Sequence, residues 1–211
     1  KSPLNRCYIT REQEIHIDIP SNFKKDEISF SDISENYCIC FVDIVGSTQL
    51  TSRIYNSDKM ARFYSTFINS IAKIIEEHGG KIMKILGDGL ISYFPATCNS
   101  ERPEAFAEAL DCFLAMKSSR LNINRKFMDQ KLPAISYRIS ADYGRTESAR
   151  TNESKFQDLF GPTVNFCVKM NKRVPPNGII IGSDLHMTLG SIPGLLQIWL
   201  TASYLRNLGL S

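Results

Sequence analysis

The sequence predicts an α+β domain in which helices pack on a mostly antiparallel sheet, and three observations lead to this fold class. A continuous apolar run at residues 37–42 has the composition of a strand buried on both faces. Two short strand-like runs, residues 81–86 and 90–94, are joined by a Gly-Asp-Gly segment that indicates a hairpin. Amphipathic helical patterns alternate with these strands. Such a mixture is typical of the α+β class.

The predicted chain organisation is a polar lead-in or linker at residues 1–36, a folded domain at residues 37–190 and a C-terminal tail at residues 191–211. Apolar side chains at three- and four-residue steps predict helices, and period-two or continuous apolar runs predict strands. The expected elements are strands at 14–19, 37–42, 81–86, 90–94, 135–141 and 179–181, helices at 60–75, 106–114 and 164–170, and a polar loop at 145–157.

Composition excludes several classes of protein. The 211 residues, 43% hydrophobic and 22% charged, suit one domain with a sizeable core and exclude a disordered or fibrous protein. With 25 Lys and Arg against 22 Asp and Glu, bulk charge does not predict a nucleic-acid partner. The best candidate for a membrane span, residues 192–205, is too short and is interrupted by polar residues. We therefore expect no transmembrane segment.

The cysteines and the N-terminus bear on the cellular setting. Six cysteines are scattered without a Cys-x-x-Cys pair, and Cys38 and Cys40 alternate within an apolar run. This pattern predicts reduced core thiols in a cytoplasmic protein. The chain starts at Lys1 without a signal-peptide pattern, so we infer a processed protein or a piece of a longer one. An upstream sensor or regulatory domain is then a candidate partner.

Two acidic residues stand where acids are structurally unusual. Asp43 directly follows the buried strand-like run, and Asp88 lies at the tip of the predicted hairpin. Each has an ordinary explanation, a helix N-cap for Asp43 and a turn residue for Asp88. However, the segment after Asp43 contains Gly46 and leads into a helix, so its N–H groups can cradle an anion. Two carboxylates brought together there would hold Mg²⁺, with nucleotide phosphates completing the coordination.

Three segments together resemble the catalytic domain of the class III nucleotidyl cyclases. They are FVDIVGST at residues 41–48, GGKIMKILGDG at residues 79–89 and DLFGPTVN at residues 158–165. Each is short, but they occur in the family's order. The resemblance implies a ferredoxin-like or palm-like sheet and an adenylate cyclase that converts ATP into 3′,5′-cyclic AMP and pyrophosphate.

The resemblance also implies a metal and phosphate site. In the family two aspartates bind two metal ions, which assigns two Mg²⁺ (or Mn²⁺) ions to Asp43 and Asp88, with the backbone carbonyl of Ile44 assisting. One ion activates the ribose 3′-hydroxyl and the other neutralises the leaving pyrophosphate. The triphosphate is expected to lie on the loop formed by Ile44, Val45, Gly46, Ser47 and Thr48.

Lys84 and Asp158 match the family's purine-selecting pair. Adenine offers an acceptor at N1 and a donor at N6, so a Lys donor and an Asp acceptor suit it, whereas guanine presents the reverse pattern. ATP is therefore the expected substrate, although an exposed strand lysine is the ordinary interpretation of Lys84. In the family this pair and the metal aspartates come from different subunits, which implies a homodimer with two interfacial sites.

The sequence departs from the family pattern at two places. Asn165 matches the asparagine that orients the ribose, but Lys169 replaces the usual arginine, which keeps the charge and loses the planar fork. Lys172 and Arg173 either substitute for it or form a solvated helix end. The family's closing segment carries a lysine that reaches the triphosphate, whereas residues 190–211 contain none. Either the motif has diverged or the chain ends before it, and weak activity is a possible consequence.

Two alternatives to an active adenylate cyclase follow. The first is a catalytically weak or inactive nucleotide-binding or dimerising module of a larger signalling protein. Retention of the predicted metal, base and ribose residues favours the enzyme, because a pure interaction module has no need for them. The second, a diguanylate cyclase, would require an acidic turn after Gly-Gly, whereas Asp88 is followed by Gly89 and Leu90. We discount it.

Overall fold

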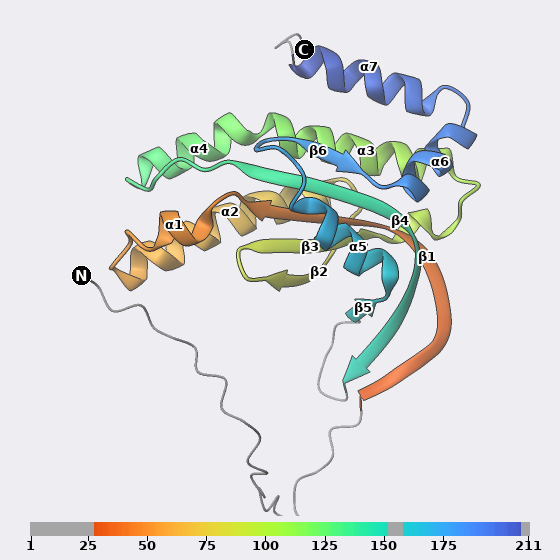
Figure 1. The fold of residues 1–211 in the computed structure, drawn as a ribbon, viewed down its shortest axis with the longest axis horizontal. Helices are drawn as coiled ribbons and strands as arrows, with labels where there is room; N and C mark the ends of the chain where they lie inside the picture. The colour runs from red at the N-terminus through yellow and green to blue at the C-terminus, as the bar shows by residue number, and fades with distance from the viewer. Residues whose placement is uncertain (1–27, 152–157, 208–211) are drawn as a thin grey trace, which may run out of the picture.

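The computed structural model describes residues 28–151 and 158–207 (Figure 1). Its elements are β1 (Ile28–Ile44), α1 (Ser47–Thr51), α2 (Ser57–Glu77), β2 (Lys81–Leu86), β3 (Gly89–Phe94), the 3₁₀ helix η1 (Pro95–Cys98), α3 (Pro103–Ser118), α4 (Arg120–Asp129), β4 (Tyr137–Thr151), β5 (Asp158–Phe160), α5 (Pro162–Asn171), β6 (Ile179–Ile181), α6 (Ser183–Ser191) and α7 (Leu195–Asn207).

The strands form a single sheet with the order β2-β3-β1-β4-β5. All neighbours along this path are antiparallel, and β6 pairs in parallel with β4 at residues 139–141. Antiparallel neighbours and packed helices confirm the α+β, palm-like class that the sequence predicts. The expected hairpin at residues 81–94 is also confirmed, as β2 and β3.

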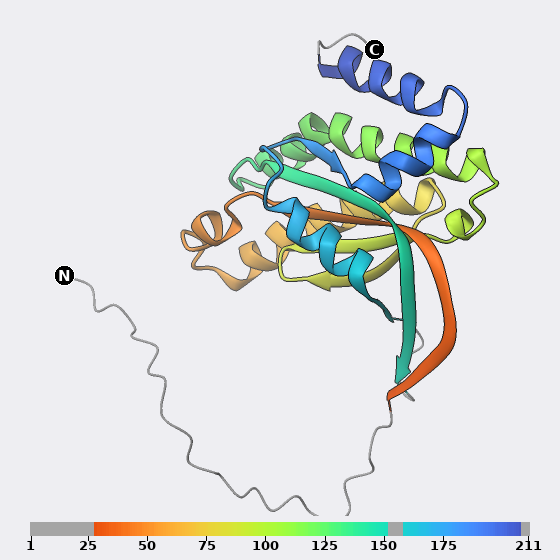
Figure 2. The same ribbon diagram turned by 45° about the vertical axis from the view of Figure 1, so that its right-hand side comes forward.

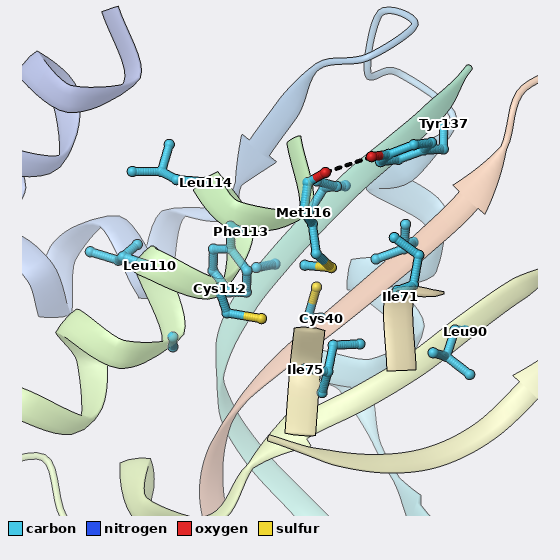
Figure 3. Close-up of a cluster of buried hydrophobic side chains, with 14 of the residues drawn as sticks. Cys40, Ile71, Ile75, Leu90, Leu110, Cys112, Phe113, Leu114, Met116 and Tyr137 are labelled. Atoms are coloured by element: carbon cyan, nitrogen blue, oxygen red, sulfur yellow. Dashed lines mark hydrogen bonds between the residues drawn. The ribbon is translucent and has the colours of Figure 1, made fainter. Parts of the chain in front are cut away.

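Helices cover both faces of the sheet (Figures 1 and 2). On one face, the larger core cluster joins α2 and α3 to the strands through Ile71, Ile75, Phe113 and Leu90, all buried. Figure 3 shows these side chains around Cys40. On the other face, α5 contributes Val164 and Cys167 to a smaller cluster with residues of β1, β2, β3 and β5. The sheet therefore separates α5 from the main core.

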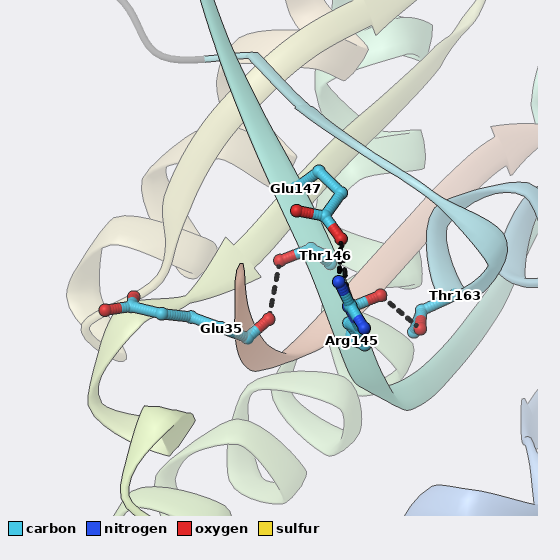
Figure 4. A network of polar contacts seen from close by, with 5 residues as sticks. All are labelled: Glu35, Arg145, Thr146, Glu147 and Thr163. Carbon is cyan, nitrogen blue, oxygen red and sulfur yellow. Dashed lines mark hydrogen bonds and ion pairs between the residues drawn. The ribbon is translucent and has the colours of Figure 1, made fainter. Parts of the chain in front are cut away.

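Helix α5 is tied to β4 at its first turn (Figure 4). The hydroxyl of Thr163 donates to the carbonyl of Arg145 at 3.0 Å. Gly144 permits this contact, because a Cβ there would lie 2.8 Å from the Thr163 hydroxyl. On the neighbouring residue, the Thr146 hydroxyl donates to the carbonyl of Glu35 in β1, also at 3.0 Å. These bonds fix the start of α5 against the β1–β4 pair.

The expected helices at residues 60–75, 106–114 and 164–170 are confirmed as parts of α2, α3 and α5. Helix α4 was not predicted, since only Ile123 and Phe127 are buried in it. The expected polar loop at 145–157 is wrong up to residue 151, and the predicted lead-in overlaps β1 from Ile28 onward. There β1 pairs with β4, and β4 also pairs with β5 at residues 147–149, so backbone hydrogen bonds between strands distant in sequence hold this segment in place. The expected strand at 14–19 lies outside the described residues.

Of the six cysteines, the five that the structure describes are free thiols, and Cys38, Cys40, Cys112 and Cys167 are buried as expected. Cys98 is exposed, contrary to the prediction of a core thiol, because it ends the short surface helix η1. Cys7 lies outside the described residues. Among the helices that the structure describes, none combines the length and apolar character needed to cross a bilayer.

Candidate active site

The structure brings the two predicted metal acids together. Asp43 is the penultimate residue of β1, and its cross-strand partner on β3 is Gly89, the residue after Asp88. The hairpin tip therefore lies beside the end of β1, where the negative charge of Asp88 acts on the Asp43 carboxyl. The close approach requires glycine at position 89, where a Cβ would lie 2.5 Å from the Phe41 ring.

The electrostatics of this pair favour a cation. Burial, and then the negative charge of Asp88, raise the pKa of Asp43 from 3.8 to about 6, while Arg138 and Lys172 act in the opposite direction. A divalent ion would relieve the repulsion between two carboxylates, and hard oxygen donors suit Mg²⁺ or Mn²⁺. Within the described residues no group of three or more His, Cys, Asp or Glu side chains could hold a metal. The remaining ligands would therefore be backbone, phosphate or water oxygens.

The predicted phosphate loop is a tight turn between β1 and α1. Gly46 caps α1 with a left-handed backbone, at φ 67° and ψ 28°. The N–H of Val45 donates to the carbonyl of Ser136 at 2.8 Å, so this amide is already engaged. The N–H groups of Gly46, Ser47 and Thr48 stand at the start of α1, where a helix leaves its first donors without internal partners. The loop therefore offers fewer amides to an anion than its sequence implies.

A β-bulge determines where Lys84 lies. The β2–β3 register shifts between Ile82 and Lys84, so Met83 is the additional residue and Lys84 pairs with Ile91. Directly paired residues share a face of a sheet, and Ile91 belongs to the cluster under α5. The bulge thus directs Lys84, which is exposed, toward the α5 side.

The other predicted base and ribose residues also border the α5 side. Asp158 opens β5 and is exposed, while the next residue, Leu159, is buried in the same cluster as Met83. Asn165 and Lys169 are both exposed on α5, four residues apart and hence on one face of the helix. Lys169 lines a groove of about 400 Å³ between α5 and β6. The cations that shift the pKa of Asp43 are Arg138 and Lys172, not Lys84 or Lys169.

Comparison with known proteins agrees with this geometry. Residues 31–194 match the family model described as the adenylate and guanylate cyclase catalytic domain. The chain belongs to this family. A cytidylate cyclase from Staphylococcus aureus is 27% identical over 72% of this chain and 37% of its own length. An adenylate cyclase from Glutamicibacter nicotianae is 26% identical over 71% of this chain and 31% of its own length. The chain thus spans about a third of each of these relatives.

Solved structures support the cyclase fold. The adenylyl cyclase CyaB from P. aeruginosa superposes with a TM-score of 0.66 at 17% identity, over 76% of this chain and 83% of that one. At this identity the likeness concerns the fold, and the names of the relatives differ in the base of the nucleotide. Family membership therefore establishes a nucleotidyl cyclase domain and leaves the base to be argued from the residues.

The sequence analysis missed one residue of this cyclase domain. Arg138 on β4 is the cross-strand partner of Asp43, and its buried Nε has no hydrogen-bond partner among the described residues. An unpaired guanidinium N–H beside two acids is suited to an anion that arrives with the metal ions. The available signal was a lone arginine within the otherwise uncharged segment 135–141.

Proposed function

We propose that this chain is the catalytic domain of an adenylate cyclase that converts ATP into 3′,5′-cyclic AMP and pyrophosphate at a homodimer interface. The observation that carries the proposal is the half-buried Asp43 carboxyl at the end of β1, paired with Gly89 directly after Asp88, whose charge raises the pKa of Asp43. Such a pair is costly for a fold that does not use it, because like charges at contact oppose one another. A structural turn would need only one of them.

Each group has a role in the proposed reaction. The oxygen of the ribose 3′-hydroxyl bonds to the α-phosphorus, the bond from that phosphorus to the bridging oxygen breaks, and the hydroxyl proton passes to solvent. Two divalent ions held by Asp43, Asp88 and the Ile44 carbonyl would activate the hydroxyl and neutralise the leaving group. Arg138 and the amides of residues 46–48 would bind phosphate oxygens. Asn165 and Lys169 would orient the ribose and stabilise the charge that develops at phosphorus.

Lys84 and Asp158 support ATP as the substrate. A lysine donor complements N1 of adenine and a carboxylate complements the N6 amine, while guanine would leave both groups mismatched. Neither side chain forms an ion pair within the described residues, so both are free to meet a base.

CTP is a second candidate substrate. Cytosine presents an acceptor at N3 beside a donor amine at N4, the same order of groups as adenine. The pair therefore distinguishes amino bases from keto bases, and it does not by itself separate adenine from cytosine. One relative at 27% identity bears the name cytidylate cyclase, which favours including CTP.

Exposed apolar side chains support the homodimer. Ile85 and Leu86, next to the Asp88 turn, are 58% and 44% exposed, and Phe166 on α5 is 48% exposed. These residues border the acid pair and the α5 face respectively, so association of two chains through them would cover apolar surface and bring the two sets of groups together.

One assay tests the proposal and its alternatives. The purified domain is incubated separately with ATP, CTP, GTP and UTP in Mg²⁺ or Mn²⁺, and the products are identified by mass spectrometry. We expect cyclic AMP and pyrophosphate from ATP, with GTP and UTP poor substrates. Cyclic CMP as the main product would favour the second candidate. Nucleotide binding without any cyclic product would instead identify the weak or inactive regulatory module.

A further inference from the structure

The contact between α5 and the sheet is partly polar, although it is buried. Ser140 on β4 and Cys167 and Asn171 on α5 are each at most 1% exposed. The Ser140 hydroxyl donates to the carbonyl of Cys167 at 2.9 Å and accepts a hydrogen bond from Asn171 Nδ2 at 3.1 Å. These bonds fix α5 along β4 more closely than apolar contacts would, because hydrogen bonds require definite distances and angles.

Asn171 also reaches both strands that carry the acid site. Its Nδ2 donates to the carbonyl of Phe41 at 3.2 Å and to that of Arg138 at 3.3 Å. Phe41 precedes Asp43 by two residues on β1 and belongs to the core cluster under α5, and Arg138 is the cross-strand partner of Asp43. Alternate strand residues and direct cross-strand partners share a face of the sheet. Asp43 and Arg138 therefore lie on the same face as Asn171.

Asn171 and Arg138 each keep one buried polar atom unpaired. Asn171 Oδ1, an acceptor, and Arg138 Nε, a donor, have no hydrogen-bond partner among the described residues. The two residues are already in contact through the Asn171 amide and the Arg138 carbonyl. Reversing the amide would not satisfy Oδ1, because that oxygen would then face the carbonyls of Phe41 and Arg138. Since unpaired buried polar groups are costly, a bond between Oδ1 and Nε would stabilise both.

We propose that Asn171 is a positioning residue for Arg138. Its Oδ1 accepts the Nε–H of the arginine, so that the remaining guanidinium N–H groups face a phosphate held by metal ions on Asp43 and Asp88. A guanidinium binds phosphate bidentately through its planar fork, and a bond at Nε fixes the plane of that fork. This inference rests on the proposed function. Asn171 acts through Arg138 and not on the nucleotide itself.

The first test measures binding of inorganic pyrophosphate with Mg²⁺ by titration calorimetry, without turnover. Asn171→Leu keeps the size and branching of the side chain and removes both polar atoms, whereas Arg138→Lys keeps the charge and lacks the Nε donor. We expect each substitution to weaken binding about tenfold. Thr163→Val removes a different hydrogen bond between α5 and β4 and is the matched control, with unchanged affinity. Circular dichroism verifies the fold of each variant.

Combining the two substitutions separates positioning from a general effect on the fold. If Asn171 acts through Arg138, Asn171→Leu should change the affinity less than about twofold in an Arg138→Lys background. An equal tenfold loss in both backgrounds would overturn the proposal, and so would wild-type affinity in Arg138→Lys. Absence of pyrophosphate binding in the wild type would contradict the proposed function and, with it, this inference.

Heteronuclear NMR of the arginine side chains gives a second readout that does not depend on turnover. The Arg138 Nε–H signal is assigned by its loss in Arg138→Lys. With Mg²⁺ and pyrophosphate bound, its exchange with solvent should be slow in the wild type and in Thr163→Val, and faster in Asn171→Leu, because the bond to Oδ1 is lost. Fast exchange in the wild type, or equally slow exchange in Asn171→Leu, would refute the proposal.

Discussion

The acid end of the sheet and the α5 side of the sheet differ in how far one chain assembles them. At the acid end, Asp43, Asp88 and Arg138 come from β1, the β2–β3 turn and β4, and the charges of Asp88 and Arg138 both act on the Asp43 carboxyl within one chain. On the α5 side, Lys84, Asp158, Asn165 and Lys169 are all exposed. Strand pairing within one chain assembles the first region. In the second region the side chains are exposed to solvent, where a second chain can contact them. This contrast is what a site shared between two subunits requires.

The largest expected effect comes from removing either acid. Asp43→Ala and Asp88→Ala should each lower the cyclisation rate by at least about 10³-fold, because each carboxylate holds the metal ions that the reaction needs. Circular dichroism should show an intact fold, since neither side chain belongs to the core clusters. Undiminished turnover in either variant would show that the acid pair is not part of the active site.

Base selection tests the α5 side. The wild-type domain should prefer ATP to GTP by about 10²-fold or more in kcat/KM, because guanine leaves the Lys84 and Asp158 groups mismatched. Changing Lys84 to Glu together with Asp158 to Ser should reduce this preference at least about tenfold, measured by competition between the two nucleotides. A wild-type domain that uses GTP as well as ATP would show that these residues do not read the base.

The pH dependence of metal binding tests whether the Asp43 carboxylate is a metal ligand. Because burial and the neighbouring Asp88 raise the pKa of Asp43 to about 6, protons compete with the metal below that pH. Apparent Mn²⁺ affinity, measured by titration calorimetry, should fall about tenfold per pH unit below 6 and level off above it. In Asp43→Asn this step should disappear along with tight binding. A wild-type affinity that is flat down to pH 5 would contradict the prediction.

Complementation tests the division between the two regions directly. Asp43→Ala and Lys84→Ala chains, both impaired alone, should regain activity when mixed, because one of the two clefts of each heterodimer is intact. At most about half of the wild-type activity per heterodimer is expected if the clefts act independently. Subunit exchange is verified with differently tagged chains. Demonstrated exchange without recovery would place the whole cleft within one chain.

The smallest expected effect is on stability. The pKa of Asp43 is raised above its unfolded value, so its ionisation in the folded state opposes folding as pH rises through about 4 to 6. At pH 7 Asp43→Asn should therefore stabilise the metal-free domain by about 1 kcal/mol after solvent screening, or about 2–4 °C in Tm. The difference should vanish below pH 4. If Asp43→Asn has a lower Tm than the wild type at pH 7, repulsion between the two carboxylates does not destabilise the folded domain.

Local sequence was sufficient for the elements whose patterns are strong. The apolar run at 37–42, the Gly-Asp-Gly turn and the stripes of α2, α3 and α5 led to the correct fold class and to the meeting of Asp43 with Asp88. These features depend on periodicity and turn chemistry, which act over a few residues. The paired segments at the start of β1 and the end of β4, like the helix α4, lack such patterns, because pairing between distant strands and packing against other helices stabilise them.

Only the tertiary structure decided how the charged residues are divided. No spacing predicts that Arg138 pairs with Asp43 across two strands almost 100 residues apart in sequence. Similarly, no local pattern predicts that the buried Asn171 side chain donates to the carbonyls of Phe41 and Arg138 and so attaches the end of α5 to β1 and β4. Sequence by itself determined which chemical groups are present and which local element carries each. Their partners depend on strand register and helix anchoring, which result from packing over the whole domain.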